Sequence, residues 1–299
     1  MNPAAPPPIV SGILLLDKPS GLTSNAVLGR AKRILATKKA GHTGTLDPMA
    51  SGLLVLCFGE ATKVSGFLLD ADKAYEAEAT LGVTTDSEDA EGEVIERREV
   101  PPLTRDDVES VLGSFRGPIM QVPPMHSALK YKGQRLYELA RRGEEVERPA
   151  RAITIHELSL TGFESPRLQL TVTCTKGTYI RSLVRDIGEA LGCGAHLSAL
   201  RRTLSAPFAL ANAHTLDELD GLDVEAARAL LLPADVALAH LPGLDLDPEQ
   251  ATRLCQGQKL SGLAAIAPGL VRVYGDGAFL GIGETDGCGR LKAKRLLAT

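Results

Sequence analysis

The pattern of apolar and polar positions predicts a chain with many β-strands. Residues 74–81 alternate strictly between the two classes, as in a strand that has one buried face. Short, uninterrupted apolar runs elsewhere have the length of fully buried strands. Strands are therefore expected at 13–16, 53–58, 74–81, 152–163, 168–174 and 195–204, with Tyr75, Ala77, Ala79 and Leu81 on the buried face of the third.

Helical segments alternate with these strands. Thr23 or Ser24 can cap a helix whose apolar residues fall on one face. Thr104 with Asp107 has the spacing of a capping box, and a second box begins at Thr215. Helices are expected at 24–35, 62–69, 104–113, 135–142 and about 180–187, from 215 onward, and at 247–257.

The order of these elements predicts an α+β fold with two units. Residues 12–212 hold most of the strands, residues 213–243 form an acidic helical connection, and residues 244–299 form a small unit with short strands broken by glycines. Because about fifty residues make only a marginal core, we expect the small unit to dock on the main body. The proline-rich residues 1–11 are expected to be disordered.

The segment 121–150 interrupts the strand pattern. Pro123 and Pro124 exclude regular structure near its start, and a basic helical stretch follows until Gly143. Such an excursion between strands suits an arm that grips a partner, although an ordinary surface loop is the alternative.

Asp47 lies in the most tightly specified loop of the chain. Three glycines within residues 41–52 allow positive φ or close backbone approach, and Pro48 moves Asp47 toward extended backbone. An Asp-Pro pair is commonly an Asx turn or a helix cap. His42 and two threonines add polar groups to the same loop, however, and no capping-box partner follows. A carboxylate held for chemistry is therefore a competing interpretation.

Charge along the chain changes the expected partner. The net charge of −4 alone argues against nucleic acid. Residues 70–110 hold fourteen acids and four bases, however, and residues 213–254 hold nine acids and two bases, so the remainder carries +13. Each basic cluster alone fits a solvated surface, whereas five together favour an anionic polymer. The clusters are Arg30, Lys32, Arg33, Lys38 and Lys39; Lys130, Lys132 and Arg135; Arg141 and Arg142; Arg201 and Arg202; Lys292, Lys294 and Arg295.

Composition argues against several other classes of protein. No apolar run has the length of a membrane span and residues 1–12 lack the features of a secretory signal, so a cytoplasmic protein is expected. Five cysteines without a C-x-x-C or a nearby His predict reduced, mostly buried thiols and no metal. A second framed carboxylate, a Gly-x-x-x-x-Gly-Lys phosphate loop and a Ser or Cys nucleophile beside a His are missing too.

Arg181 occupies the first turn of a predicted helix, where the helix dipole favours acidic side chains. A cation at this end predicts a specific anionic partner, such as a carboxylate. The apolar stripe of the helix leaves Arg181 and Arg185 together on another face; the stripe contains Ile180, Leu183, Val184 and Ile187.

Six separated motifs resemble, in the same order, the family of bacterial tRNA pseudouridine synthases B. They are LLLDKPSG at 14–21, GHTGTLDP at 41–48, GLL at 52–54, GEATK at 59–63, DKAY at 72–75 and GTYIRS at 177–182. More loosely, VRVY at 271–274 and FLGIG at 279–283 resemble a PUA-type RNA-binding domain. The family implies a catalytic domain over 12–212 with a mixed, mainly antiparallel sheet and flanking helices. It also implies an RNA-gripping insertion at about 121–150 and a small β-rich PUA-like domain over 244–299.

The resemblance implies roles for individual residues. Asp47 would be the catalytic aspartate and Arg181 its ion-pair partner. Tyr75 would stack on the target uracil, although a tyrosine in an alternating strand is more often part of the core. His42 would fill the stack that the flipped base leaves, and Lys18 would support the site loop. The pocket would be lined by Tyr179, Leu200 and Lys63.

The implied activity is the isomerisation of uridine to pseudouridine at position 55, in the T loop of tRNA. The uridine leaves the loop, the N1 glycosidic bond breaks with the help of Asp47, the uracil turns, and carbon 5 bonds to the ribose. No cofactor or metal is required, and the expected enzyme is a cytoplasmic monomer that binds the T stem-loop. Two alternatives stay open: a noncatalytic RNA-binding protein or RNA chaperone, and a synthase that uses a guide RNA or acts on ribosomal RNA.

Overall fold

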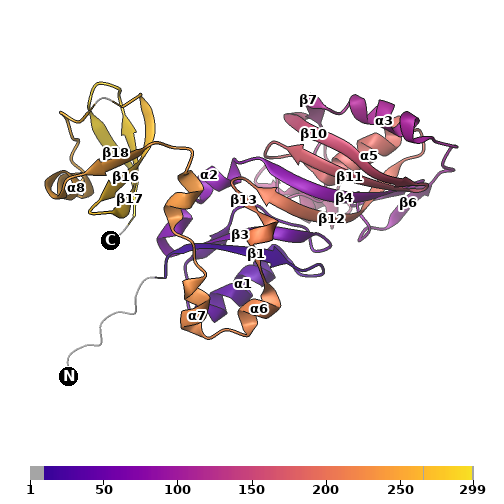
Figure 1. Cartoon of the computed structure of the whole chain (residues 1–299). Coiled ribbons are helices and arrows are strands. Elements are labelled where there is room, and N and C mark those ends of the chain that lie inside the picture. The colour runs from indigo at the N-terminus through magenta and orange to yellow at the C-terminus, as the bar shows by residue number, and fades with distance from the viewer. Residues whose placement is uncertain (1–9, 265, 298–299) are drawn as a thin grey trace.

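Two sheets organise the computed structural model, which describes residues 10–264 and 266–297 (Figure 1). Within these residues, a ten-stranded sheet forms the main body and a four-stranded sheet forms a separate C-terminal unit. The expected α+β class, with a mainly antiparallel main sheet, flanking helices and a small β-rich unit, is confirmed. Of the predicted disordered start, residues 1–9 lie outside the described residues.

The strands of the main sheet come from the whole length of the main body. They are β1 (Gly12–Lys18), β2 (Ala40–His42), β3 (Ser51–Phe58), β4 (Lys73–Leu81), β7 (Gly117–Gln121), β10 (Arg151–Glu164), β11 (Arg167–Cys174), β12 (Ala195–Ser205), β13 (Phe208–Ala209) and β14 (His214–Thr215). The small sheet contains β15 (Gly243–Leu246), β16 (Gly269–Gly275), β17 (Ala278–Thr285) and β18 (Leu291–Leu296). Two ribbons pair β5 (Val83–Thr85) with β6 (Val94–Arg97) and β8 (Lys130–Tyr131) with β9 (Gln134–Arg135).

The helices are short and lie between these strands. The α-helices are α1 (Ser24–Ile34), α2 (Ser65–Leu69), α3 (Arg105–Gly113), α4 (Leu136–Ala140), α5 (Ile180–Ala190), α6 (Leu216–Asp220), α7 (Val224–Ala229) and α8 (Pro248–Cys255). The 3-10 helices are η1 (Gly59–Lys63), η2 (Leu210–Asn212) and η3 (Ala234–Leu238).

Helix caps lie where the sequence predicts them, but two helices differ from expectation. Thr23 caps α1, and Thr104 with Asp107 forms the capping box of α3. The helix predicted at 62–69 divides into η1 and α2, in a stretch where β-branched residues and a glycine have low helix propensity. The helix predicted at 135–142 is reduced to α4.

The strand β12 completes the middle of the main sheet. The order β14-β1-β3-β12-β4-β11-β10-β7 places it between β3 and β4, which are close in sequence. Arg202 of β12 is the register partner of Gly52 on one side and of Tyr75 on the other. Gly52 has a φ of 98°, and a Cβ there would lie 2.3 Å from the Arg202 carbonyl oxygen, so the close approach requires glycine. One strand, β12, therefore separates the end of the Asp47 loop from Tyr75.

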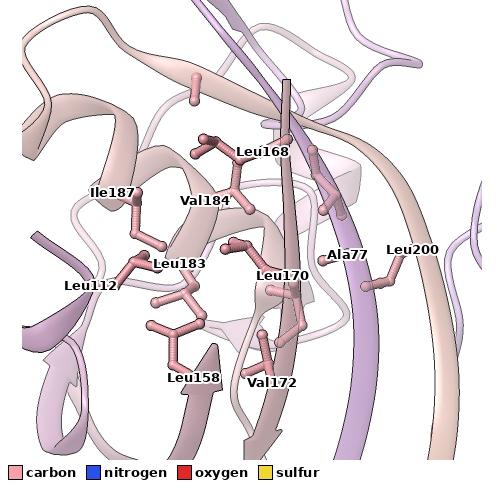
Figure 2. Close-up of a cluster of buried hydrophobic side chains, with 14 of the residues drawn as sticks. Ala77, Leu112, Leu158, Leu168, Leu170, Val172, Leu183, Val184, Ile187 and Leu200 are labelled. Atoms are coloured by element: carbon pink, nitrogen blue, oxygen red, sulfur yellow. The ribbon is translucent and has the colours of Figure 1, made fainter. Parts of the chain in front are cut away.

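Three apolar clusters hold the main body together. Helices α3 and α5 cover one face of β4, β10, β11 and β12, and the predicted stripe of α5 is buried there. Figure 2 shows Leu183, Val184 and Ile187 of α5 directed at the sheet, and Leu200 of β12 beside Ala77 of β4. A second cluster packs α1, α6 and α7 on β1 and β3.

The third cluster joins the small unit to the main body. It contains Val55 of β3, Leu238 of η3 and Ile282 of β17. The Tyr274 hydroxyl also donates to Asp235 Oδ2 at 2.8 Å. The small unit therefore docks on the main body, as the sequence predicts.

Two further features concern the whole chain. The five cysteines are free thiols, of which Cys57, Cys174 and Cys193 are buried. Over 10–264 and 266–297, no helix combines the length and the apolar character that crossing a membrane requires.

Candidate active site

An ion pair between Asp47 and Arg181 lies at the centre of the candidate site. Arg181 Nε lies 3.0 Å from Asp47 Oδ2, and Arg181 Nη2 donates to Asp47 Oδ1 at 3.5 Å. The Arg181 side chain is 6% exposed, whereas the Asp47 side chain is 36% exposed. The guanidinium is thus covered by protein, while the carboxylate remains open to a ligand. The anionic partner that the helix position of Arg181 predicts is Asp47.

Further contacts fix the Arg181 guanidinium. Nη1 donates to the carbonyl oxygen of Ser87 and Nη2 to that of His126, both at 2.8 Å. Nε also lies 3.6 Å from Oδ2 of the buried Asp89. Two carboxylates and two carbonyls from three loops therefore hold one cation in place.

The surroundings perturb the Asp47 carboxylate. Burial raises its pKa above the ordinary value, and the nearby Asp89 acts in the same direction. Arg181 and Lys18 oppose this shift. A raised pKa, one side open to a ligand and a buried cation on the other side are features that are common among catalytic carboxylates.

The residues on both sides of Asp47 are clamped by the N-terminal segment. The Ser24 hydroxyl donates to the Leu46 carbonyl at 2.9 Å and accepts from the Leu46 amide at 2.8 Å. Lys18, which is 0% exposed, donates to the Pro48 carbonyl at 3.2 Å. Burial lowers the pKa of Lys18, while the charge of Asp47 raises it. The backbone that carries Asp47 is therefore held in place before any substrate arrives.

Tyr75 and Leu200 belong to the same apolar cluster as the Asp47 loop. Tyr75 is half-buried and packs on this cluster, which contains Leu46 and Leu200. Burial raises the pKa of the Tyr75 hydroxyl, and the positive charge of Arg202 opposes this shift. The structure therefore brings Asp47, Arg181, Tyr75 and Leu200 together.

Tyr179 lies at the N-cap of α5, two residues before Arg181. Gln121, at the end of β7, fixes its backbone by two hydrogen bonds. Gln121 Nε2 donates to the Tyr179 carbonyl at 3.0 Å, and the Tyr179 amide donates to Gln121 Oε1 at 2.9 Å. The base of the 121–150 segment is thus bound to the helix that carries Arg181.

His42 lies on β2, five residues before Asp47. Burial, followed by the charge of Arg202, lowers the pKa of its ring, which favours the neutral form. Its Nδ1 is buried and has no hydrogen-bond partner among the described residues.

Two sequence-based assignments do not fit the geometry. Lys63 was expected to line the pocket, but its Nζ lies 2.5 Å from Glu60 Oε2 and donates to the Leu296 carbonyl at 2.8 Å. It lies beyond the far end of β3, where the small unit docks. Arg202 was grouped with the exposed basic clusters, but it is 3% exposed and faces the core. Alternation along a strand explains the error, because neighbouring residues face opposite sides of the sheet.

Three segments of the chain match descriptions of one protein family. Residues 32–180 match the TruB family pseudouridylate synthase (N terminal domain). Residues 181–239 match the tRNA pseudouridylate synthase B C-terminal domain, and residues 242–297 match the C-terminal domain of pseudouridine synthase II TruB. The chain belongs to the TruB family. The resemblance carried by the six motifs is thereby confirmed.

Similar TruB proteins and solved structures can be aligned with nearly the whole length of this chain. The tRNA pseudouridine synthase B of Aromatoleum aromaticum is 55% identical over 291 residues, which cover 97% of this chain and 94% of that protein. That of Chromohalobacter salexigens is 50% identical over 294 residues, covering 97% and 95%. A solved H/ACA RNP bound to a substrate RNA containing 2'-deoxyuridine matches with a TM-score of 0.71 and 28% identity, covering 97% of this chain and 86% of that one. A Cbf5-Nop10-Gar1 complex matches with a TM-score of 0.70 and 29% identity, covering 96% and 84%.

The sequence did not single out several residues that support this TruB site. Ser24 was one of two candidate caps, Gln121 opened the proline-containing 121–150 segment, and Asp89 belonged to the acidic block of residues 70–110. Each acts on a residue far away in the sequence, so no local pattern marks it. In the sequence, Asp89 is one of fourteen acids between residues 70 and 110, and only the structure shows that its side chain is buried.

A cavity of about 340 Å³ lies beside Arg185, which is one helical turn after Arg181 on α5. Glu88, Arg148 and Arg185 are among its lining residues. Glu88 pairs with Arg185 and accepts from the Ser182 hydroxyl at 2.7 Å, so the charged groups here are largely satisfied. Nowhere in the described ranges do three His, Cys, Asp or Glu side chains form a group that could hold a metal ion.

Proposed function

We propose that this chain converts uridine to pseudouridine at position 55 in the T loop of tRNA. The observation that carries the proposal is the open Asp47 carboxylate paired with a buried Arg181, in a loop clamped on both sides. The name tRNA pseudouridine synthase B, borne by relatives that are 50–55% identical to this chain, supports tRNA as the substrate. The enzyme would be a cytoplasmic monomer.

The uridine must first leave the T loop. Flipping a base costs a few kcal/mol, and stacking on the Tyr75 ring offsets part of that cost. His42, whose neutral ring has a free buried nitrogen among the described residues, would fill the gap in the stack. Tyr179 and Leu200 would line the pocket around the uracil.

The chemistry then depends on an ionised Asp47. The carboxylate acts on the ribose or on the base, or stabilises an intermediate, while the bond from N1 to the ribose breaks. The uracil turns, carbon 5 bonds to the ribose, N1 gains a proton and carbon 5 loses one, so the reaction is a net isomerisation. Arg181 keeps the carboxylate ionised and aimed, because its guanidinium meets both carboxylate oxygens.

Basic side chains of the 121–150 segment would contact the RNA backbone. Arg135 and Arg141 flank α4, and the Cζ atoms of their guanidiniums lie 5.8 and 5.5 Å from the centroid of the Tyr137 ring. In the small unit, Lys292 and Lys294 surround Glu284 at 2.9 and 3.6 Å. These clusters would supply the positive surface that the overall charge conceals.

The proposal is tested with purified protein and a tRNA transcript that carries tritium at carbon 5 of its uridines. The protein alone should release tritium, and carbodiimide mapping should locate one pseudouridine at position 55. Asp47→Asn should bind the transcript without releasing tritium, and a transcript with cytidine at position 55 should not react.

Two outcomes would contradict the proposal. Binding without tritium release by the wild-type protein would favour an RNA-binding protein or chaperone. Activity that requires an added guide RNA, or that modifies ribosomal RNA instead, would move the substrate away from tRNA.

A further inference from the structure

Gln121 is a buried amide at the base of the 121–150 segment, and the mechanism above gives it no part. The residue is 2% exposed. Its Nε2 donates to the Tyr179 carbonyl at 3.0 Å, and its Oε1 accepts from the Tyr179 amide at 2.9 Å. A side-chain amide can bond both main-chain groups of one residue in this way, because it carries donors and an acceptor side by side. One side chain therefore holds the backbone of Tyr179 at two points.

Tyr179 lies at the start of the helix that carries Arg181. It is the N-cap of α5, and its carbonyl also accepts from the Leu183 amide at 3.0 Å, as the first hydrogen bond of the helix. Arg181 is the second residue of α5. Since such bonds fix the backbone of a helix, the place of Tyr179 determines where the Arg181 side chain begins. The Tyr179 ring, which would line the uracil pocket, begins from the same backbone.

Gln121 itself is anchored in the main sheet. It is the last residue of β7 and the register partner of Arg151, the first residue of β10. The chain thus leaves the sheet and returns to it at one residue pair, and the basic residues proposed to contact RNA lie in between. His126 belongs to this excursion, and its carbonyl accepts from Arg181 Nη2 at 2.8 Å. A movement of the segment would therefore pull directly on Arg181, whereas Gln121 ties the start of α5 to the sheet.

We propose that Gln121 is a positioning residue, which acts through the Tyr179 backbone to hold Arg181 against Asp47 while the 121–150 segment grips RNA. Without its two hydrogen bonds, the start of α5 is free to follow the segment. A displacement of about 1 Å at a reacting group can slow a reaction about a hundredfold. Because both bonds lie within the protein, their loss should slow the chemical step more than it weakens tRNA binding. This role rests on the proposed function.

The first variant removes both hydrogen bonds. Gln121→Met keeps the length of the side chain but has no amide to bond Tyr179. In single-turnover tritium release at saturating enzyme, the rate should fall about tenfold or more at every pH. The dissociation constant for tRNA should stay within about twofold of the wild-type value, and the circular dichroism spectrum should not change.

A second variant, Gln121→Glu, gives a readout that a purely structural role would not produce. An ionised carboxylate accepts from the Tyr179 amide but turns a second acceptor toward the Tyr179 carbonyl, whereas the protonated acid donates to that carbonyl as glutamine does. Burial raises the pKa of such a carboxyl group, and the cations Arg151 on β10 and Arg181 on α5 oppose this shift. The ratio of variant to wild-type rate should therefore rise about tenfold as the pH falls from about 8.5 to about 5.5.

A matched control tests whether a new carboxyl group alone produces such a pH dependence. Gln250 lies on α8 of the small unit, and its Oε1 also accepts from a main-chain amide, that of Asp247 at 3.3 Å. Gln250→Glu should react at the wild-type rate throughout the pH series. The ratio for Gln121→Met should be low and constant over the same range.

The outcomes separate positioning from folding and from RNA binding. A folded Gln121→Met protein that reacts within about threefold of the wild type would overturn the proposal, and so would a loss of rate that follows weaker tRNA binding. A Gln121→Glu ratio that does not rise at low pH, or activity lost together with the circular dichroism signal, would overturn it too. If Gln121→Met does not fold, the pH series of Gln121→Glu decides alone. A wild-type protein that makes no pseudouridine would instead refute the proposed function.

Discussion

Replacing Arg181 by lysine should reduce turnover strongly while leaving tRNA binding and folding intact. The change keeps a positive charge near Asp47 and removes the planar fork of donors. In the wild type, this fork meets both oxygens of Asp47, at 3.0 and 3.5 Å, and the carbonyls of Ser87 and His126, at 2.8 Å. A single ammonium cannot occupy all of these positions at once.

The size of the effect follows from the bonds that lysine loses. A hydrogen bond to a charged group contributes about 1.5–3 kcal/mol, and a buried carbonyl left without a donor adds about 1 kcal/mol or more. Losing one charge-assisted bond and one carbonyl partner therefore costs about 2–4 kcal/mol, or roughly 30- to 1,000-fold in rate. Arg181→Met should reduce the rate further, because no cation then replaces the guanidinium beside the Asp47 carboxylate and the pKa of that carboxylate rises further.

The assay is single-turnover tritium release at saturating enzyme, with filter binding for affinity and circular dichroism for folding. Arg116→Lys serves as the control for loss of a guanidinium–carbonyl bond, because Arg116 Nε donates to the Leu158 carbonyl at 2.8 Å, outside the site. An Arg181→Lys variant that reacts within threefold of the wild type would show that the fork geometry is not needed. A rate loss that follows weaker tRNA binding would instead assign Arg181 to recognition.

Three further predictions follow from charge and packing. Burial raises the pKa of Asp47, and the ionised form is the one that acts. As the pH is lowered, the rate should therefore begin to fall at a higher pH than it would with an aspartate of ordinary pKa. A constant rate from about pH 7 to about pH 4 would contradict this. Replacing Arg141 and Arg142 by glutamine should flatten the plot of log affinity against log salt by about one to two units, and an unchanged slope would place the RNA elsewhere. Removing residues 244–299 should lower the melting temperature, because the third cluster loses Ile282. It should also raise the KM for full-length tRNA more than the KM for an isolated T-arm hairpin. Equal increases of KM for the two substrates would show that the small unit does not contact the RNA.

Most strands could be predicted because the apolar pattern of each strand is visible in its own residues. The alternation at 74–81 corresponds to β4, and the apolar run at 53–58 lies within β3. Short-range rules also located the caps at Thr23 and Thr104. The basic helix was overextended, because the residues at its two ends join a ribbon and a turn rather than adding helical turns.

The centre of the candidate site could be anticipated from two local anomalies. Asp47 lies in a loop whose three glycines and Pro48 restrict the backbone to unusual conformations. Arg181 lies in the first turn of a helix, where the helix dipole disfavours a positive charge. The supporting residues could not be anticipated, because a serine that bridges Leu46 or a glutamine that bridges Tyr179 looks like any other polar residue in sequence. Lys63 shows a different limitation of the sequence. It lies in one of the family motifs, but a motif does not reveal the direction in which a side chain points.

The place of β12 in the sheet also bears on the order in which the protein is made. During synthesis, β3 and β4 leave the ribosome more than a hundred residues before the strand that must lie between them. Until β12 emerges, both strands present unpaired edges toward one another, and the Asp47 loop lacks the Gly44 contact that Arg202 provides. A chain that ends between residues 182 and 194 therefore contains Asp47, Tyr75 and Arg181 without the strand that completes the sheet between them. Such incomplete products are exposed to strand pairing with other chains until β12 is added.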